Sequence, residues 1–159
     1  MERAGGRLSV SWYIIREASQ KMKKILVAED EAIIAMVWKE ALEDAGYSVT
    51  TSQTGLQTLG HLRGEKFDLL ITDLNMPDGG DFLVASEINR LNDKIPLIVV
   101  SGDAQLLNDG ALEKMTALGA DAVAVKPITT DKLLQMVQEV KANGREMSLA
   151  GRLKSLFEF

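Results

Sequence analysis

The chain of 159 residues contains no cysteine, a single histidine, three prolines and only 5% aromatic residues. Without cysteine it can form no disulfide, thiolate nucleophile or thiolate metal site, which fits a reducing compartment. No apolar run approaches the roughly 20 residues that a membrane-spanning helix needs. The nearest candidate for a signal-peptide core, residues 8–15, is interrupted by Ser9 and Ser11 and is followed by no clear cleavage site. We therefore expect a cytoplasmic protein that does not bind membranes.

The charge balance restricts the classes of partner. A net charge of −5 at pH 7 argues against a general nucleic-acid binder, because binding to polyphosphate relies on a basic surface. The chain is long enough for one domain of ordinary size with short extensions. Since Ile25 begins the first convincing pattern, we expect residues 1–21 to be a disordered N-terminal extension, residues 22–143 to form the domain and residues 144–159 to be a C-terminal tail.

Short apolar runs alternate with stretches of helical spacing along the domain. The runs predict strands over residues 25–28, 47–51, 69–73, 95–100 and 122–125. The spacing predicts helices over residues 33–45, 56–62, 82–91 and 108–118, and a last helix capped by Asp131. We expect Gly46 to close the first helix and Pro96 to lie near the start of its strand. Five strands alternating with five helices predict an α/β fold with a doubly wound parallel sheet.

Polar residues follow four of these strands. Glu29 and Asp30 follow the first strand, Asp73 ends the third, Ser101 follows the fourth and Lys126 the fifth. Right-handed crossovers place the carboxyl ends of all parallel strands at one edge of the sheet. The sequence therefore predicts that these side chains share one site.

The residue types at this edge suit phosphoryl transfer. Three neighbouring carboxylates repel one another unless a cation lies among them, and an all-oxygen site suits Mg²⁺. The Lys126 ammonium can pair with Asp73 or with a phosphoryl oxygen, and the Ser101 hydroxyl can bond that oxygen. A carboxylate in such a site can itself be the nucleophile and form an aspartyl-phosphate.

Four short motifs in order resemble a known family. They are Glu29-Asp30, the segment 72–77 (Thr-Asp-Leu-Asn-Met-Pro), Ser101-Gly102 and Lys126-Pro127. Each motif is weak alone, but all four in this order, each at the end of a predicted strand, resemble the receiver domain of two-component response regulators, of the single-domain chemotaxis-regulator type. The resemblance covers about residues 22–143. It implies a flavodoxin-like five-stranded sheet of order 2-1-3-4-5.

The resemblance also implies the partners and the metal ligands. Asp73 would accept a phosphoryl group from a histidine kinase, a histidine phosphotransfer protein or a small phosphodonor. Mg²⁺ would be bound by Asp30 and Asp73, by Glu29 mainly through a water, and by the backbone carbonyl of Asn75. The protein would signal by contacts with an unknown downstream protein, and a homodimer stays open. It would be a phosphoacceptor rather than an enzyme in the ordinary sense.

Further roles follow from the same resemblance. Ser101 would be the switch hydroxyl and Lys126 the lysine that pairs with the phosphate, and the Lys126-Pro127 peptide bond would be cis. Asn75 and Asp103 fall where family members line the approach of hydrolytic water. Val123 stands where the family often has an aromatic ring, so we expect the phosphorylation signal to be read through backbone shifts or another face.

Other functions fit the sequence less well. The first alternative is a receiver-like interaction module that works without phosphorylation; the complete set of acidic residues and lysine argues against it. A flavodoxin-like enzyme or nucleotide binder is disfavoured because Glu29-Asp30-Glu31, not a glycine-rich phosphate loop, follows the first strand. His61, the one histidine, is interpreted as an ordinary helix residue. In the tail, Leu149, Leu153, Leu156 and Phe157 have the spacing of an amphipathic helix.

Overall fold

The computed structural model describes residues 24–78, 84, 87–88, 90, 95–102 and 119–143. The expected N-terminal extension (1–21), the expected helix over 108–118, Asp103 and the C-terminal tail (144–159) lie outside the described residues. Of the expected helix over 82–91, Val84, Glu87, Ile88 and Arg90 are described, and all four are helical.

Strands and helices alternate over the described residues between 24 and 101, as the sequence predicts. The strands are β1 (Lys24–Ala28), β2 (Ser48–Ser52), β3 (Leu69–Asp73), β4 (Leu97–Ser101) and β5 (Ala122–Val125). The helices with complete bounds are α2 (Ala32–Asp44), α3 (Gly55–Gly64) and α6 (Thr130–Asn143). None of the helices in these ranges is long and apolar enough to cross a membrane.

The five strands form one parallel sheet of order β2-β1-β3-β4-β5, which confirms the expected fold. In the register, Ala28 at the end of β1 lies beside Thr72 of β3, and Asp73 lies beside Val100 of β4. Pro96 directly precedes β4, where its missing N–H removes no bond from the strand, and its carbonyl oxygen accepts from the Leu70 amide at 3.0 Å. The carboxyl ends of β1, β3, β4 and β5 therefore meet at one edge.

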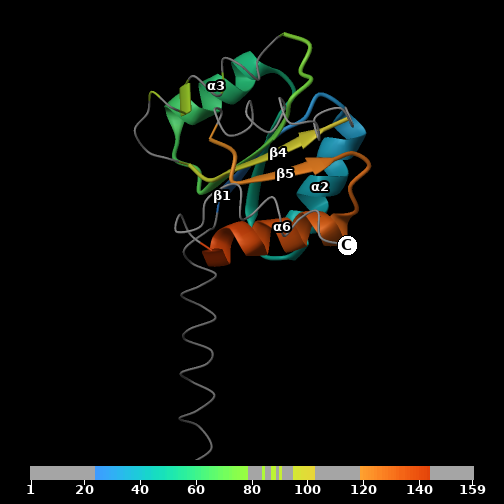
Figure 1. Ribbon diagram of the computed structural model, residues 1–159. Helices are drawn as coiled ribbons and strands as arrows, with labels where there is room; N and C mark the ends of the chain where they lie inside the picture. The colour runs from blue at the N-terminus through green and yellow to red at the C-terminus, as the bar shows by residue number, and fades with distance from the viewer. Residues whose placement is uncertain are drawn as a thin grey trace, which may run out of the picture.

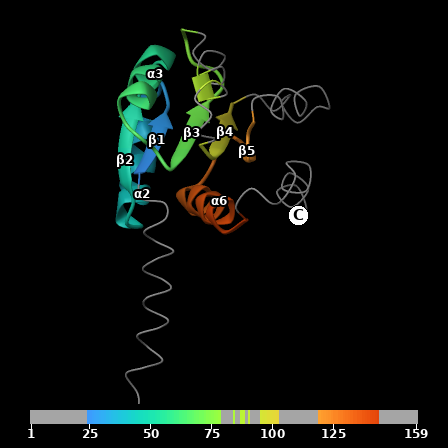
Figure 2. The same cartoon turned by 90° about the vertical axis from the view of Figure 1, so that its left-hand side faces the viewer.

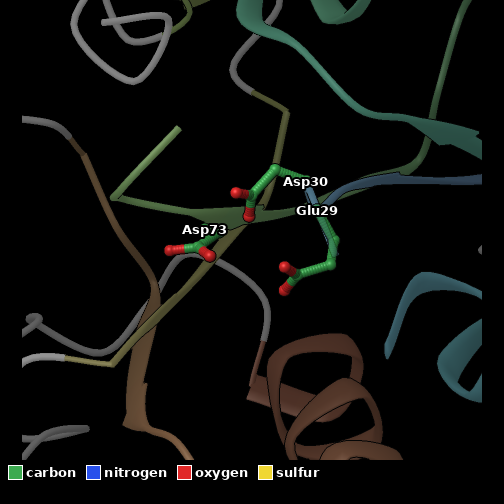
Figure 3. Close-up of side chains that lie close together, drawn as sticks. All are labelled: Glu29, Asp30 and Asp73. Atoms are coloured by element: carbon green, nitrogen blue, oxygen red, sulfur yellow. The ribbon is translucent and has the colours of Figure 1, made fainter. Parts of the chain in front are cut away.

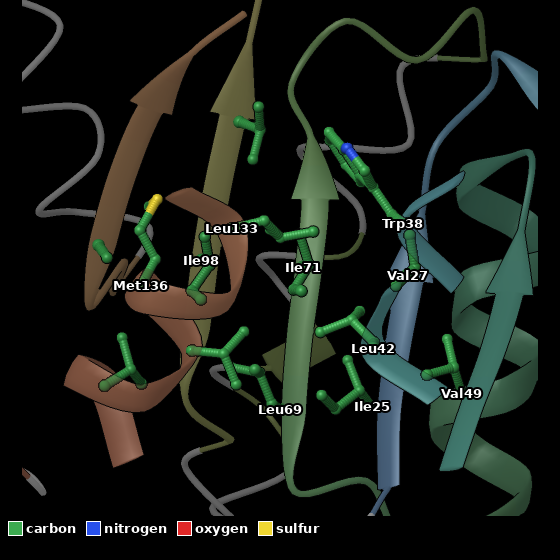
Figure 4. Packing of buried hydrophobic residues seen from close by; sticks show 14 residues of the cluster. Ile25, Val27, Trp38, Leu42, Val49, Leu69, Ile71, Ile98, Leu133 and Met136 are labelled. Carbon is green, nitrogen blue, oxygen red and sulfur yellow. The ribbon is translucent and has the colours of Figure 1, made fainter. Parts of the chain in front are cut away.

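Helices cover both faces of the sheet (Figures 1 and 2). Because neighbouring residues of a strand point to opposite faces, Ile25 and Val27 pack on the α2 and α6 side, and Leu26 and Ala28 on the α3 side. Figure 4 shows the first of these cores, in which α2 and α6 close over the sheet. Both faces are apolar, which explains why the central strands are continuous hydrophobic runs.

Local chemistry sets the helix ends. Gly46 follows α2 with a φ of +99°, a conformation that favours glycine, and its amide donates to the Glu43 carbonyl oxygen at 2.9 Å. At α6 the prediction for Asp131 was wrong, because the Thr129 hydroxyl oxygen accepts from the Lys132 amide at 3.1 Å and caps the helix. Asp131 lies in the first turn instead, where its charge complements the helix dipole.

Candidate functional site

Three carboxylates gather at the carboxyl edge of the sheet. Glu29 and Asp30 leave the end of β1, and Asp73 is the last residue of β3 (Figure 3). One oxygen of each side chain lies within 4.8 Å of the others. Glu29 is fully buried and Asp73 is 4% exposed, whereas Asp30 is half-buried. We call this cluster the acidic pocket: its carboxylates Glu29 and Asp73 are buried, and Asp30 is more accessible.

Lys126 supplies the positive charge of this pocket. It directly follows β5, and its Nζ lies 2.8 Å from Asp73 Oδ2 and 2.7 Å from Glu29 Oε2. Glu31 Oε1 is farther from the ammonium, at 3.9 Å. One ammonium therefore bridges the carboxylates that follow β1 and end β3, as the topology predicts for side chains at this edge.

Burial and charge act in opposite directions on the pKa values of Glu29 and Lys126. Burial raises the pKa of Glu29, against the opposing effect of Lys126. Burial alone would lower the pKa of Lys126, but its contacts with Asp73 and Glu29 outweigh this and raise it. Lys126 is therefore an ammonium at neutral pH.

The loop after β3 is anchored by Asn75 and Met76. The Asn75 amide donates to Asp73 Oδ1 at 2.9 Å, so both oxygens of Asp73 have a partner. Met76 then buries its side chain in the core on the α3 side and is only 4% exposed. These contacts fix the backbone that passes directly beside Asp73.

Ser101 is fully buried at the end of β4, and its carbonyl oxygen accepts from the Lys126 amide at 2.7 Å. This bond places the backbones of the two residues side by side at the carboxyl edge of the sheet. The Lys126-Pro127 peptide bond is cis, as expected.

The donor set fits a hard divalent cation. The three carboxylates offer oxygen ligands only, which is the chemistry that Mg²⁺ prefers. Glu29 Oε2 is ion-paired with Lys126 yet makes no hydrogen bond of good geometry, so a buried oxygen retains unused acceptor capacity. Asp30 reaches the solvent-accessible side, where an ion could keep waters.

Comparison with known proteins agrees with this geometry. Residues 25–138 match the response regulator receiver domain family. The chain belongs to this family. As a receiver domain, it is a signalling domain of two-component systems, and its acidic cluster fits the magnesium site of such domains.

Individual relatives show the same likeness. The chain is 31% identical over 109 residues to the sensor protein EvgS of Escherichia coli, covering 69% of this chain and 9% of EvgS. It is similar in structure to a CheY-like receiver from Methanospirillum hungatei, with a TM-score of 0.70 and 27% identity, covering 77% of this chain and 95% of that one. It is also similar to the response regulator TrrA of Thermotoga maritima, which was solved in complex with Mg²⁺-BeF. The TM-score is 0.65 and the identity 30%, and the match covers 75% of this chain and 99% of TrrA.

The curated relatives are longer proteins. The chain spans 9% of the length of EvgS, 27% of the Salmonella regulator ZraR and 48% of the Bacteroides regulator RprY. The shared part is the receiver domain, and the remaining parts of those proteins have no counterpart in the match.

One departure from the family pattern is visible in the packing of this receiver. Val123, at the position where an aromatic ring is common, is 4% exposed and packs in the core on the α3 side. A buried valine has no ring to turn between an inner and an outer position. The expectation that the signal is read elsewhere stays a prediction.

Sequence reasoning missed an apolar groove beside the acidic pocket. The groove has a volume of about 540 Å³ and lies between α2 and the segment that joins β5 to α6. Its lining consists of Glu31, Ile33, Ile34, Val37, Trp38, Gly102, Lys126, Pro127 and Ile128. Ile33 is 74% exposed and Val37 44% exposed. The sequence feature that could have indicated the groove is the composition of α2, which has apolar residues outside its buried face.

Proposed function

We propose that this receiver domain is phosphorylated on Asp73, with Mg²⁺, by a histidine kinase or a histidine phosphotransfer protein, and that it signals by protein contacts in the cytoplasm. The observation that carries the proposal is the position of Asp73, which is held 2.8 Å from the Lys126 ammonium within a cluster of three carboxylates. This arrangement suits a nucleophile that must carry a phosphoryl group.

The transfer would proceed by in-line displacement. An oxygen of Asp73 attacks the phosphorus of a phosphohistidine, the P–O bond forms as the P–N bond breaks, and the electron pair of the broken bond stays on the imidazole nitrogen, which takes a proton from water. Lys126 then pairs with a phosphoryl oxygen, because it already lies against Asp73. Ser101, beside Lys126, would donate its hydroxyl to another phosphoryl oxygen.

Mg²⁺ would be bound by Asp30 and Asp73 directly, by Glu29 through a water and by the backbone carbonyl of Asn75. When bound, the ion neutralises charge on the transferring phosphoryl group. Glu29 suits the indirect role, because its carboxylate is fully buried and already pairs with Lys126. Asp30 suits direct binding because it is the accessible carboxylate of the three.

The groove would then be a docking surface for the phosphodonor protein. A donor histidine must come within bonding distance of Asp73, so the donor has to cover the surface around the pocket. The groove adjoins the pocket, since Lys126 belongs to both, and it exposes Ile33 and Val37. An amphipathic helix of the donor would bury these side chains, as helices do in apolar grooves.

Docking and chemistry can be separated by the choice of donor. Ile33→Asp should slow phosphorylation by a phosphohistidine protein at least tenfold and leave phosphorylation by a small phosphodonor such as acetyl phosphate unchanged. Leu56→Asp is the matched control, because Leu56 is also exposed (68%) but lies on α3, away from the groove. Equal effects of the two substitutions with the protein donor would refute the docking surface.

Binding of beryllofluoride tests the site itself. With Mg²⁺, the wild type should bind one beryllofluoride per chain, observed by ¹⁹F nuclear magnetic resonance, and Asp73→Asn should bind none. If the wild type binds none, phosphorylation at Asp73 is refuted and the interaction module that works without phosphate becomes the better account.

A further inference from the structure

Asp78 connects the loop after β3 to the start of α3. Its Oδ1 accepts from the Gly55 amide at 3.0 Å, and its Oδ2 accepts from the Leu56 amide at 3.2 Å. These two amides belong to the first turn of α3, 23 and 22 residues earlier in the chain. Helix N–H groups in the first turn have no partner within the helix, and a carboxylate is the acceptor best suited to them.

The helix does not depend on Asp78 alone for its cap. The Thr54 hydroxyl oxygen accepts from the Gln57 amide at 3.2 Å, as an ordinary N-cap residue does. Two separate side chains therefore satisfy the α3 N-terminus. Thr54 is adjacent to the helix, whereas Asp78 comes from the loop that carries Asp73.

Asp78 completes the anchoring of that loop. The loop is held to Asp73 Oδ1 by the Asn75 amide, to the core by Met76 and, five residues after Asp73, to α3 by Asp78. Pro77 stands between the last two anchors and restricts the backbone further. Within the described part of the loop, Asp78 is the anchor farthest from Asp73.

We propose that Asp78 is a positioning residue for the metal site: its two hydrogen bonds to α3 hold the loop in the conformation in which Asp73 and the Asn75 backbone bind Mg²⁺. The inference rests on the proposed function for the identity of the ligands. It concerns a residue that touches neither the metal nor the phosphoryl group, and its effect on the metal runs through the backbone of the loop.

A matched pair of variants separates positioning from simple capping. Asp78→Ala removes the bonds between the loop and α3, whereas Thr54→Ala removes a cap of the same helix and leaves the loop attached. Both should lower the midpoint of urea unfolding by similar amounts. Asp78→Ala alone should weaken Mg²⁺ binding, by about fivefold, the factor that corresponds to the loss of an ordinary capping interaction. Asp78→Asn keeps one acceptor oxygen, so its Mg²⁺ affinity should lie between that of the wild type and that of Asp78→Ala.

Mg²⁺ affinity is measured by isothermal titration calorimetry, and Mn²⁺ affinity by electron paramagnetic resonance, so that neither readout needs phosphorylation. Unchanged metal affinity in Asp78→Ala, equal weakening in Thr54→Ala, or no metal binding by the wild type would overturn the inference. If the wild type binds Mg²⁺ and Asp78→Ala weakens it, but beryllofluoride does not bind, the proposed function fails while the positioning role stands.

Discussion

Replacing Lys126 with methionine is the perturbation for which the structure gives the clearest magnitude. Methionine has a similar length and no charge, so the substitution removes the ammonium and keeps much of the packing. Two buried carboxylates, Glu29 and Asp73, then lose the cation that lies 2.7 and 2.8 Å from them. Without it they repel each other and the protein should become less stable.

The expected loss is about 3 kcal/mol in the absence of metal. At an effective dielectric constant of about 20, each contact is worth about 6 kcal/mol of Coulomb energy, but desolvation of the charges offsets most of it. Removing one partner of a buried ion pair costs about 3 to 5 kcal/mol, and the 14% exposure of the Lys126 side chain favours the lower end. Such a loss is a large part of the stability of an ordinary domain.

Mg²⁺ should partly replace the missing charge. Since Lys126 and the ion occupy the same acidic pocket, removing the lysine should tighten Mg²⁺ binding about tenfold, which restores about 1.4 kcal/mol at saturating metal. Lower pH should also reduce the difference in stability between the wild type and Lys126→Met. Burial raises the pKa of Glu29, and protonation of Glu29 removes one of the repelling charges.

Urea unfolding in chelator and in saturating Mg²⁺ measures both effects. Lys24→Met is the control, because Lys24 forms an exposed pair with Glu65 and its loss should cost less than about 1 kcal/mol. The reasoning is refuted if Lys126→Met costs no more than this control, or if Mg²⁺ leaves the difference between wild type and Lys126→Met unchanged.

Other predictions concern the rest of the domain. Glu87 contacts Arg90 and Arg63, which lower its pKa from 4.5 to about 2; its stabilising contribution is therefore complete above pH 4.5 and lost as the pH falls toward 2. Acid unfolding should show this loss in the wild type and not in Glu87→Gln. Gly46→Ala should lower the free energy of unfolding by about 1 to 2 kcal/mol, because φ is +99° there. Gly60 lies in the exposed interior of α3, so Gly60→Ala should raise the free energy of unfolding by about 0.5 to 1 kcal/mol. A lower thermal midpoint for Gly60→Ala would contradict this.

The sheet could be predicted because its signals are local. Ile25 to Ala28 and Leu69 to Ile71 are short apolar runs, each followed within two residues by an acidic residue, and this pattern indicates both the strand and its carboxyl end. Once the strands are parallel and the crossovers right-handed, the pocket follows from the topology. That is why sequence reasoning already placed Glu29, Asp30, Asp73 and Lys126 in one site, where the structure brings them together.

Two features that sequence reasoning missed, the Asp78 bonds and the groove, depend on contacts between distant segments. The bond from Asp78 to the start of α3 joins residues more than 20 positions apart, and no local pattern predicts it. The groove arises because Val37, though apolar, lies beside the buried stripe of Ala35, Trp38 and Leu42 and stays 44% exposed. Thr129 and Asp131 are both good cap residues, and only the observed start of α6 decides between them.

The measurement that tests the central claim most directly is the intact mass of the protein after incubation with a small phosphodonor, with Mg²⁺ or with chelator. The wild type should gain the mass of one phosphoryl group with Mg²⁺ and far less in chelator, and Asp73→Asn should gain none. A wild type that stays unmodified with Mg²⁺, or an Asp73→Asn variant that is modified to the same extent, would contradict the assignment of Asp73 as the phosphoacceptor.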